Sequence, residues 1–209
     1  LEKCVEKQAM DKPQGGAVVG AREQLAQLRQ FVIDRDIVAV PGTETALVKE
    51  APAYQRQNFA FINIPGPYEN ALPSVYYIAP PDPKWTAEEQ AAYVPGIKNL
   101  LFTSVHEVWP GHFLNYLHAN RAPSLFGRVF VGYAFAEGWA HYAEELVVEA
   151  GLDGGSAETR IGQLSNALLR NCRYLSAIGL HARGMTQEQS RELFRNECYQ
   201  DEGTARQQS

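Results

Sequence analysis

Residues 105–112 read VHEVWPGH, and this stretch decides how the second half of the chain can fold. It contains His106 and Glu107, followed by a second histidine, His112. In the ordinary motif H-E-x-x-H, two histidines four residues apart share one helical face and bind one Zn²⁺, and the glutamate acts as general base. A straight helix turns by about 600° over six residues, so His106 and His112 would point to different sides of it. An uninterrupted helix therefore cannot bring both imidazoles to one metal ion.

The Pro-Gly pair inside this stretch offers a way around that obstacle. Pro110 lacks a backbone donor, and its ring clashes with the carbonyl of the residue four positions earlier, which is His106. Gly111 tolerates the unusual backbone angles that a local bulge needs. The pair therefore predicts a bulge that absorbs two residues and returns His112 toward His106. A simple corner between two helices, with no metal, is the alternative.

A second segment, residues 136–145, reads AEGWAHYAEE. Glu137, His141 and Glu144 are spaced i, i+4 and i+7, which places them on one helical face. A catalytic zinc site needs a third protein ligand and an open position for water. A metal would explain why charged groups share a face with alanine and tryptophan. An exposed charged stripe is the alternative.

The remaining pattern predicts an α+β fold that is mainly helical, with a single domain over 1–209. A small N-terminal sheet occupies the β-containing part, 1–85, and a helical bundle occupies 86–209, which the resemblance given below implies to be zincin-like. Helical periodicity and cap residues such as Thr86 and Thr186 place the helices, and short apolar runs place the strands. Helices are predicted at 17–34, 97–109, 112–119, 133–150, 157–183 and 186–199, and strands at 37–40, 46–48, 59–64 and 74–78.

Composition excludes several classes of protein. The chain has 209 residues, of which 45% are hydrophobic and 21% are charged, and this is an ordinary globular composition. Its formal net charge of −5 gives no sequence-wide basic footprint for nucleic acid. No apolar run reaches the roughly 18 residues of a membrane span.

The three cysteines are Cys4, Cys172 and Cys198, and their spacing matches no zinc ribbon or CxxC pattern. We read them as free thiols, with a Cys172–Cys198 disulfide as the alternative. The chain begins with Leu1 rather than methionine, and this suggests a fragment of a longer protein. The lack of a signal peptide then says nothing of the parent protein, for which a periplasmic or secreted location stays open.

Three segments in order resemble the bacterial domain of unknown function 885 family, which is regarded as metallopeptidase-like. They are HEVWPGH at 106–112, FAEGWAHYAE at 135–144 and IGLHARGMT at 178–186. The resemblance spans roughly 60–205 and implies a fragment, since family members are usually longer. The middle segment is also similar to the Asn-Glu-Gly-Phe-Ala segment of aminopeptidase N-like gluzincins, in which the glutamate is the third zinc ligand.

The resemblance implies a role for each matching residue. The zinc ligands would be His106, His112 and Glu137, and Glu107 would be the general base. Glu144 and Tyr142 would face the substrate or support the ligands, so that the choice between Glu137 and Glu144 as third ligand stays open. His181 would act on the oxyanion side or support the ligands, with a core histidine as the alternative. Tyr142 and His181 thus join Glu107 as candidate catalytic residues.

Two positions depart from the family pattern. Phe113 stands where the family often has a second histidine, and we do not expect it to be a ligand. His141 replaces a usually apolar residue, so it would lie at the surface or crowd the metal.

The strand at 74–78 is expected to be an edge strand, since prolines flank it and gluzincins pair such a strand with extended peptide.

The expected function is zinc-dependent hydrolysis of peptide bonds, with a peptide or small amide as substrate. Zinc would polarise the scissile carbonyl and lower the pKa of water toward about 7, and Glu107 would move the proton. One alternative is a metal-free scaffold or binding homologue that keeps the helices. Another is a metal-dependent hydrolase of a non-peptide amide or ester. The sequence does not separate these classes, nor does it give the oligomeric state.

Overall fold

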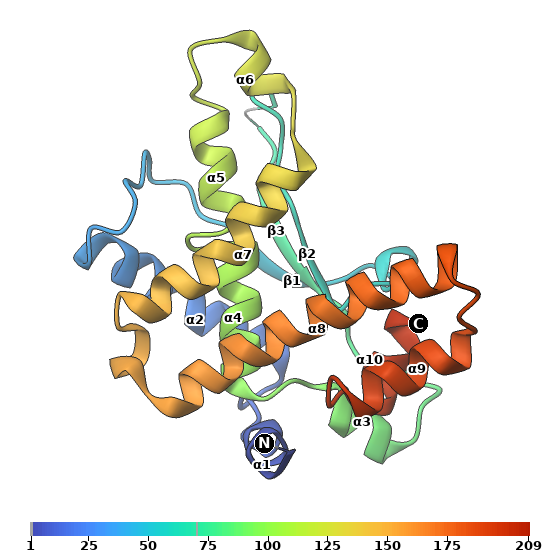
Figure 1. The fold of residues 1–209 in the computed structure, drawn as a ribbon. Helices are drawn as coiled ribbons and strands as arrows, with labels where there is room; N and C mark the ends of the chain where they lie inside the picture. Colours follow the sequence, from blue (N-terminus) through green and yellow to red (C-terminus); the bar gives the residue numbers. More distant parts are fainter. Residues whose placement is uncertain (1, 70) are drawn as a thin grey trace.

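Helix α4 (Ile97–Glu107) runs through the middle of the molecule, and helices α2, α7 and α8 pack around it (Figure 1). The computed structural model describes residues 2–69 and 71–209. On α4, Leu100, Phe102 and Val105 are completely buried, together with the polar Ser104. A helix with buried residues on several faces belongs in the centre of a fold. The C-terminal end of this central helix carries His106 and Glu107.

The element order confirms an α+β, mainly helical fold. The helices predicted at 17–34 and 112–119 have these bounds, and the other predicted helices end within a few residues of the expected positions. Helices α1, α6 and α10 were not predicted. The remaining elements are α1 (Glu2–Met10), α2 (Ala17–Asp34), β1 (Leu47–Glu50), β2 (Ala60–Asn63), β3 (Val75–Ile78), α3 (Ala87–Tyr93), α5 (His112–Ala119), α6 (Leu125–Val129), α7 (Tyr133–Glu149), α8 (Ala157–Ala182), α9 (Gln187–Asn196) and α10 (Glu202–Gln208).

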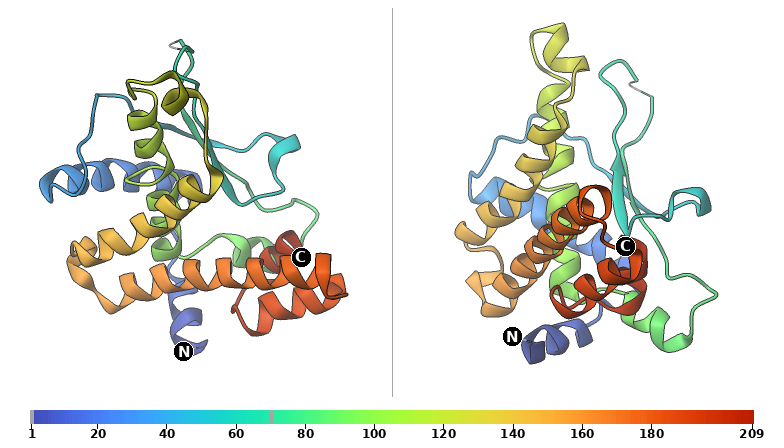
Figure 2. Two further views of the ribbon diagram at one scale, coloured as in Figure 1. Left: turned by 45° about the horizontal axis from the view of Figure 1, so that its top comes forward. Right: turned by 45° about the vertical axis from the view of Figure 1, so that its right-hand side comes forward.

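The sheet has three strands in the order β1-β3-β2, with β1 parallel and β2 antiparallel to β3. The prediction that 74–78 forms an edge strand is therefore wrong, since β3 lies in the centre. Val75, Tyr76 and Ile78 are buried, as expected of a central strand. Pro73 and Pro80 lie just outside the paired residues, so they cost the ladder no hydrogen bond. The sheet lies beside the helices, and both of its edge strands contact them, β1 against α2 and β2 against α4 (Figure 2).

The segment 37–40, which was predicted as a strand, is irregular. Its apolar side chains Ile37, Val38 and Val40 are nevertheless partly buried against the main core. An apolar run of this length shows that a segment packs on the core, but not that it has a strand partner. Among the described residues, no helix is both long enough and apolar enough to cross a membrane.

A second, smaller core joins α8, α9 and α10. Cys172, Phe194, Cys198 and Ala205 are buried there. The capping box formed by Thr186 and Gln189 begins α9, and α9 packs along α8. Cys172 and Cys198 form a disulfide, with Cα atoms 6.5 Å apart, so the reading of both as free thiols is wrong. Spacing in sequence could not reveal it, because the pairing depends on how α9 packs on α8. Cys4 is a free, exposed cysteine.

We expect Cys172→Ser to lower the free energy of unfolding by about 2–5 kcal/mol, because the bridge closes a loop with a sequence separation of 26. Urea unfolding followed by circular dichroism measures the change. Reductant should destabilise the wild-type protein and leave the variant unaffected. Cys4→Ser is the matched control and should change stability by less than about 0.5 kcal/mol. Equal stability of Cys172→Ser and the wild type would contradict the bridge.

Candidate metal centre

The chain breaks its helix between His106 and His112, where α4 ends at Glu107 and α5 begins at His112. Within the turn, the Val108 N–H donates to the Ser104 carbonyl at 2.9 Å, and the Gly111 N–H donates to the Val105 carbonyl at 3.0 Å. The expected bulge is thus a full break with two helices, and the intervening residues loop out. A Cβ atom on Gly111 would lie 1.8 Å from the His106 carbonyl oxygen, so the turn admits only glycine at this position.

Helix α7 packs on α4 and α5 and donates a hydrogen bond to this turn. The Trp139 Nε1–H donates to the Pro110 carbonyl at 2.9 Å. On the other side of the turn, the ring of Trp109 packs edge-on against Phe113, with ring centroids 5.1 Å apart. Phe113 is buried, so it is a core residue and not a ligand. The two sequence motifs therefore hold each other in place, and Glu137 on α7 faces the junction of α4 and α5.

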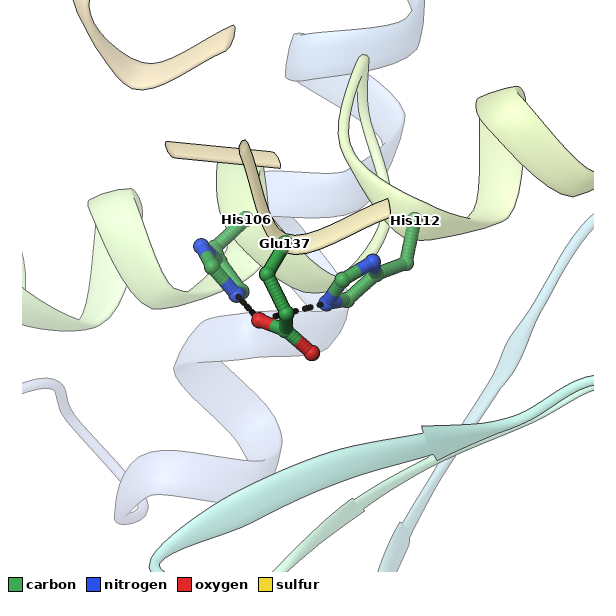
Figure 3. Close-up of side chains that lie close together, drawn as sticks. All are labelled: His106, His112 and Glu137. Carbon is green, nitrogen blue, oxygen red and sulfur yellow. Dashed lines mark ion pairs between the residues drawn. The ribbon is translucent and has the colours of Figure 1, made fainter. Parts of the chain in front are cut away.

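His106, His112 and Glu137 form one cluster of donor atoms (Figure 3). Glu137 Oε2 lies 3.5 Å from His106 Nε2 and 3.6 Å from His112 Nε2. A direct N–H···O hydrogen bond would bring such atoms to about 2.9 Å. Two ligands that each lie about 2.1 Å from a tetrahedral Zn²⁺ are about 3.4 Å apart. The observed spacing thus fits three ligands around one ion better than it fits direct hydrogen bonds.

The charges of the cluster favour a cation. The facing imidazoles of His106 and His112 hold the pKa of the Glu137 carboxyl far below its usual range, so this carboxylate is ionised. Burial lowers the pKa of His106, but the Glu137 and Glu144 carboxylates outweigh burial and raise it overall. An ionised carboxylate beside two imidazoles is a donor set that suits Zn²⁺.

Glu144 lies on the other side of His106 from Glu137. It is completely buried, and its Oε1 accepts a hydrogen bond from His106 Nδ1 at 2.8 Å. Because an ionised carboxylate only accepts, the proton of His106 sits on Nδ1 and leaves Nε2 free to bind a metal. Of the two candidate third ligands, the structure therefore brings Glu137 to the ligand cluster and places Glu144 behind His106.

The side chain of Arg170, on α8, completes this buried network. Its Nη1 donates to Glu144 Oε2 at 3.0 Å, and its Nη2 contacts Glu144 Oε1 and lies 2.9 Å from His106 Nδ1. The guanidinium thus neutralises the charge of a buried carboxylate that already accepts a hydrogen bond from His106. Sequence reasoning missed Arg170, because nothing in its own segment marks a link to the histidines.

Glu107 follows His106 on α4, and it is buried at the wall of the cavity. Burial raises the pKa of the Glu107 carboxyl above its usual value, and the neighbouring Glu137 carboxylate adds to this effect. A carboxyl group with a raised pKa is better suited to accept and return a proton near neutral pH.

The cluster opens into a cavity of about 680 Å³, a volume that suits a small molecule or a short peptide. Strand β2 and helices α4, α5, α7, α8 and α10 line it. Two tyrosines line it, the partly buried Tyr116 on α5 and Tyr133 at the start of α7, which is 77% exposed. Burial raises the pKa of Tyr116, followed by the charges of Tyr133 and Glu137. Helical spacing could have identified both tyrosines, because Tyr116 is four residues after His112 and Tyr133 is four residues before Glu137.

The other predicted catalytic residues lie outside the cavity lining. Tyr142 is five residues after Glu137, so it points to another side of α7 and is not among the residues that line the cavity. His181 is exposed on the last turn of α8, eleven residues beyond Arg170, which is about 16 Å along the helix. The structure therefore brings neither residue to the cluster. His141 is exposed and does not belong to the donor cluster either.

The chain thus combines a mainly helical α+β fold with two histidines and a glutamate gathered at the wall of a cavity. Residues 8–209 match the family described as "Bacterial protein of unknown function (DUF885)", and the chain belongs to that family. A comparison with curated proteins gives no match.

Solved structures share the fold. One, from Shewanella oneidensis, is described as a "putative lipoprotein of unknown function"; it is 26% identical, with a TM-score of 0.78, and the match covers 99% of this chain and 37% of that one. A second, from Colwellia psychrerythraea, is described as a "putative lipoprotein"; it is 21% identical, with a TM-score of 0.62, and the match covers 93% of this chain and 33% of that one. This chain therefore spans about a third of the length of each.

We expect Gly111→Ala to lower stability by about 1–3 kcal/mol, because the added methyl group meets the His106 carbonyl. The thermal midpoint should fall by about 2–4 °C for each kcal/mol. Gly138→Ala is the matched control on α7, where a Cβ meets nothing within 4 Å. It should stabilise the helix by up to about 1 kcal/mol. A thermal scan in which both variants behave alike would contradict the close packing of the turn.

Proposed function

We propose that this chain carries the catalytic site of a zinc-dependent hydrolase that cleaves peptide bonds. The observation that supports it is the spacing of His106, His112 and Glu137, which suits one tetrahedral ion at the wall of the cavity. These three residues would hold the zinc, and a fourth position stays open toward the cavity, as in catalytic zinc sites. Zinc bound there supplies a Lewis acid for the scissile carbonyl and lowers the pKa of water.

Glu107 is the residue we assign to proton transfer. It is next to His106 in the chain, lines the cavity, and has a pKa raised by burial. It takes a proton from the attacking water and passes it to the leaving amine nitrogen as the C–N bond breaks. Because the same carboxyl group must act first as base and then as acid, a pKa raised toward neutrality suits both steps.

Tyr116 and Tyr133 are the hydroxyl donors nearest the cluster along α5 and α7. Each lies one helical turn from a proposed ligand, on the same helical face, and both line the cavity. We assign them to the negative charge that develops on the carbonyl oxygen. Hydroxyl groups fixed beside such an oxygen stabilise the transition state without reorganising.

The free edge of β2 favours a peptide over other amides. The Ala79 N–H donates to the Phe59 carbonyl at 2.7 Å, so the Phe59–Ala79 pair is hydrogen-bonded. Antiparallel pairs alternate, and with the observed register the backbone groups of Ala60 and Ile62 point away from β3. Both residues line the cavity. An extended peptide can therefore add to β2 through main-chain hydrogen bonds.

For the longer protein we propose a location outside the cytoplasm. Structures that share the fold are described as lipoproteins. The Cys172–Cys198 disulfide agrees with an oxidising compartment, since such bridges are rare in reducing cytosol.

A metal analysis tests the proposed site. The purified protein should contain about one zinc per chain by plasma mass spectrometry after zinc loading. His112→Ala should lose this zinc, whereas His141→Ala, an exposed histidine on α7, should keep it. Glu107→Gln should keep the zinc and lose about 10²–10⁴-fold in hydrolysis of an unstructured peptide. A folded protein that takes up no zinc would favour the metal-free scaffold, and a zinc protein that cleaves only esters would favour the non-peptide hydrolase.

Substitution of single tyrosines tests the proposed stabilisation of the carbonyl oxygen. We expect Tyr116→Phe or Tyr133→Phe to lower kcat by about 10²-fold with little change in KM, because a donor to the developing oxyanion is lost. Tyr142→Phe should keep the wild-type kcat, since its side chain lies outside the cavity lining. Steady-state kinetics with one peptide substrate measures kcat and KM for the three variants. A loss confined to Tyr142→Phe would reverse the assignment.

A further inference from the structure

Beyond the metal cluster, the cavity continues to a second arginine on α8, Arg173. It lies three residues after Arg170 and therefore on a neighbouring part of the same helical face. The two arginines have different surroundings. Arg170 is paired with the buried Glu144. Arg173 donates from Nε to Gln208 of α10, and among the described residues no carboxylate lies within 4.0 Å of it.

Arg173 lines the cavity, and part of its side chain stays accessible. Burial, followed by the charge of Arg170, lowers the pKa of the Arg173 guanidinium, and the more distant carboxylates of Glu107 and Glu137 oppose this shift. The guanidinium therefore lacks full hydration, and among the described residues it has no carboxylate in direct contact. A substrate carboxylate would supply the partner, and the planar guanidinium suits it because it can donate two parallel hydrogen bonds.

The direction of β2 shows which end of a peptide would reach Arg173. Strand β2 begins after Phe59, whose ring packs against Tyr93 at 5.7 Å. Tyr93 in turn contacts Gln207 of α10, and the next residue, Gln208, holds Arg173. The start of β2 and the guanidinium therefore belong to the same end of the cavity.

An antiparallel peptide on the free edge of β2 ends near the start of that strand. Its carboxyl terminus thus arrives at the end of the cavity where Arg173 lies. A parallel peptide would bring its cationic amino terminus there instead, and like charges repel. The polarity of β2 and the charge of Arg173 consequently select the same orientation of the peptide.

We propose that Arg173 binds the C-terminal carboxylate of the substrate, so that the site removes residues from the carboxyl end of peptides. This rests on the proposed function. Arg170 touches His106, and Arg173 is about 4.5 Å further along α8. An extended residue spans about 3.3–3.6 Å. The scissile bond is therefore one or two residues from the terminus. Water adds its hydroxyl to the carbonyl carbon, the C–N bond breaks, and the leaving amine takes the proton.

Binding to an inactive protein tests the proposal without turnover. The probes are N-acetyl-tetra-alanine with a free carboxylate and the same peptide as its C-terminal amide, titrated by calorimetry into zinc-loaded Glu107→Gln. We expect the acid to bind about 10- to 100-fold more tightly than the amide, as for a charge-assisted hydrogen bond. Adding Arg173→Ala should remove this preference and leave amide binding nearly unchanged. Arg173→Lys should keep part of it, since the charge stays and the fork is lost.

The matched control is Arg160→Ala, which changes another arginine of α8 that pairs with Glu145 on the surface. It should keep the full preference for the acid. Equal binding of acid and amide to the folded protein would overturn the proposal, as would internal cleavage of a longer peptide seen by mass spectrometry. Both results leave zinc binding and hydrolysis intact, so they differ from a failure of the proposed function, in which no zinc is bound and neither peptide is cleaved.

Discussion

The buried ion pair between Glu144 and Arg170 is the interaction on which the arrangement of the site depends. Glu144 has no exposed surface, and a buried carboxylate is costly unless a partner and hydrogen bonds compensate for it. Arg170 and His106 supply both. Removing one partner of such a pair typically costs about 3–5 kcal/mol. The pair therefore requires α4, α7 and α8 to meet where they do, and it orients His106 as it does so.

The break between α4 and α5 brings the second histidine, His112, to His106. Since His106 is fixed by Glu144, the second histidine can reach it only if the chain turns sharply after Glu107. Pro110 and Gly111 make that turn, and Trp139 holds it against α7. The same helix then presents Glu137 to both imidazoles. The two motifs are thus parts of one interlocked structure, and each would lose its geometry without the other.

Local signals predicted most of the helices and the return of His112 toward His106, and the family resemblance indicated Glu137 as the third donor. Pairings between distant segments could not be predicted. Capping residues such as Thr186 act within one turn, so they are visible in sequence. The central position of β3, the Cys172–Cys198 bridge and the Arg170 contact all depend on packing between separate elements. Tyr142 was misleading for a different reason, because proximity in a motif is not proximity on a helix. The face that carries Glu137 is continued four residues earlier, not five residues later.

Arg170 and Arg173 have the same side chain but different surroundings, and we therefore propose different roles for them. Both lie on the cavity side of α8, only three residues apart. Arg170 is already satisfied by a buried carboxylate, and its charge is therefore unavailable to a substrate. Arg173 is held by a neutral amide, which fixes its position without cancelling its charge. Because Arg170 is neutralised and Arg173 is not, negative charge is attracted toward the part of the cavity that Arg173 lines. This difference would give a peptide on β2 a defined direction.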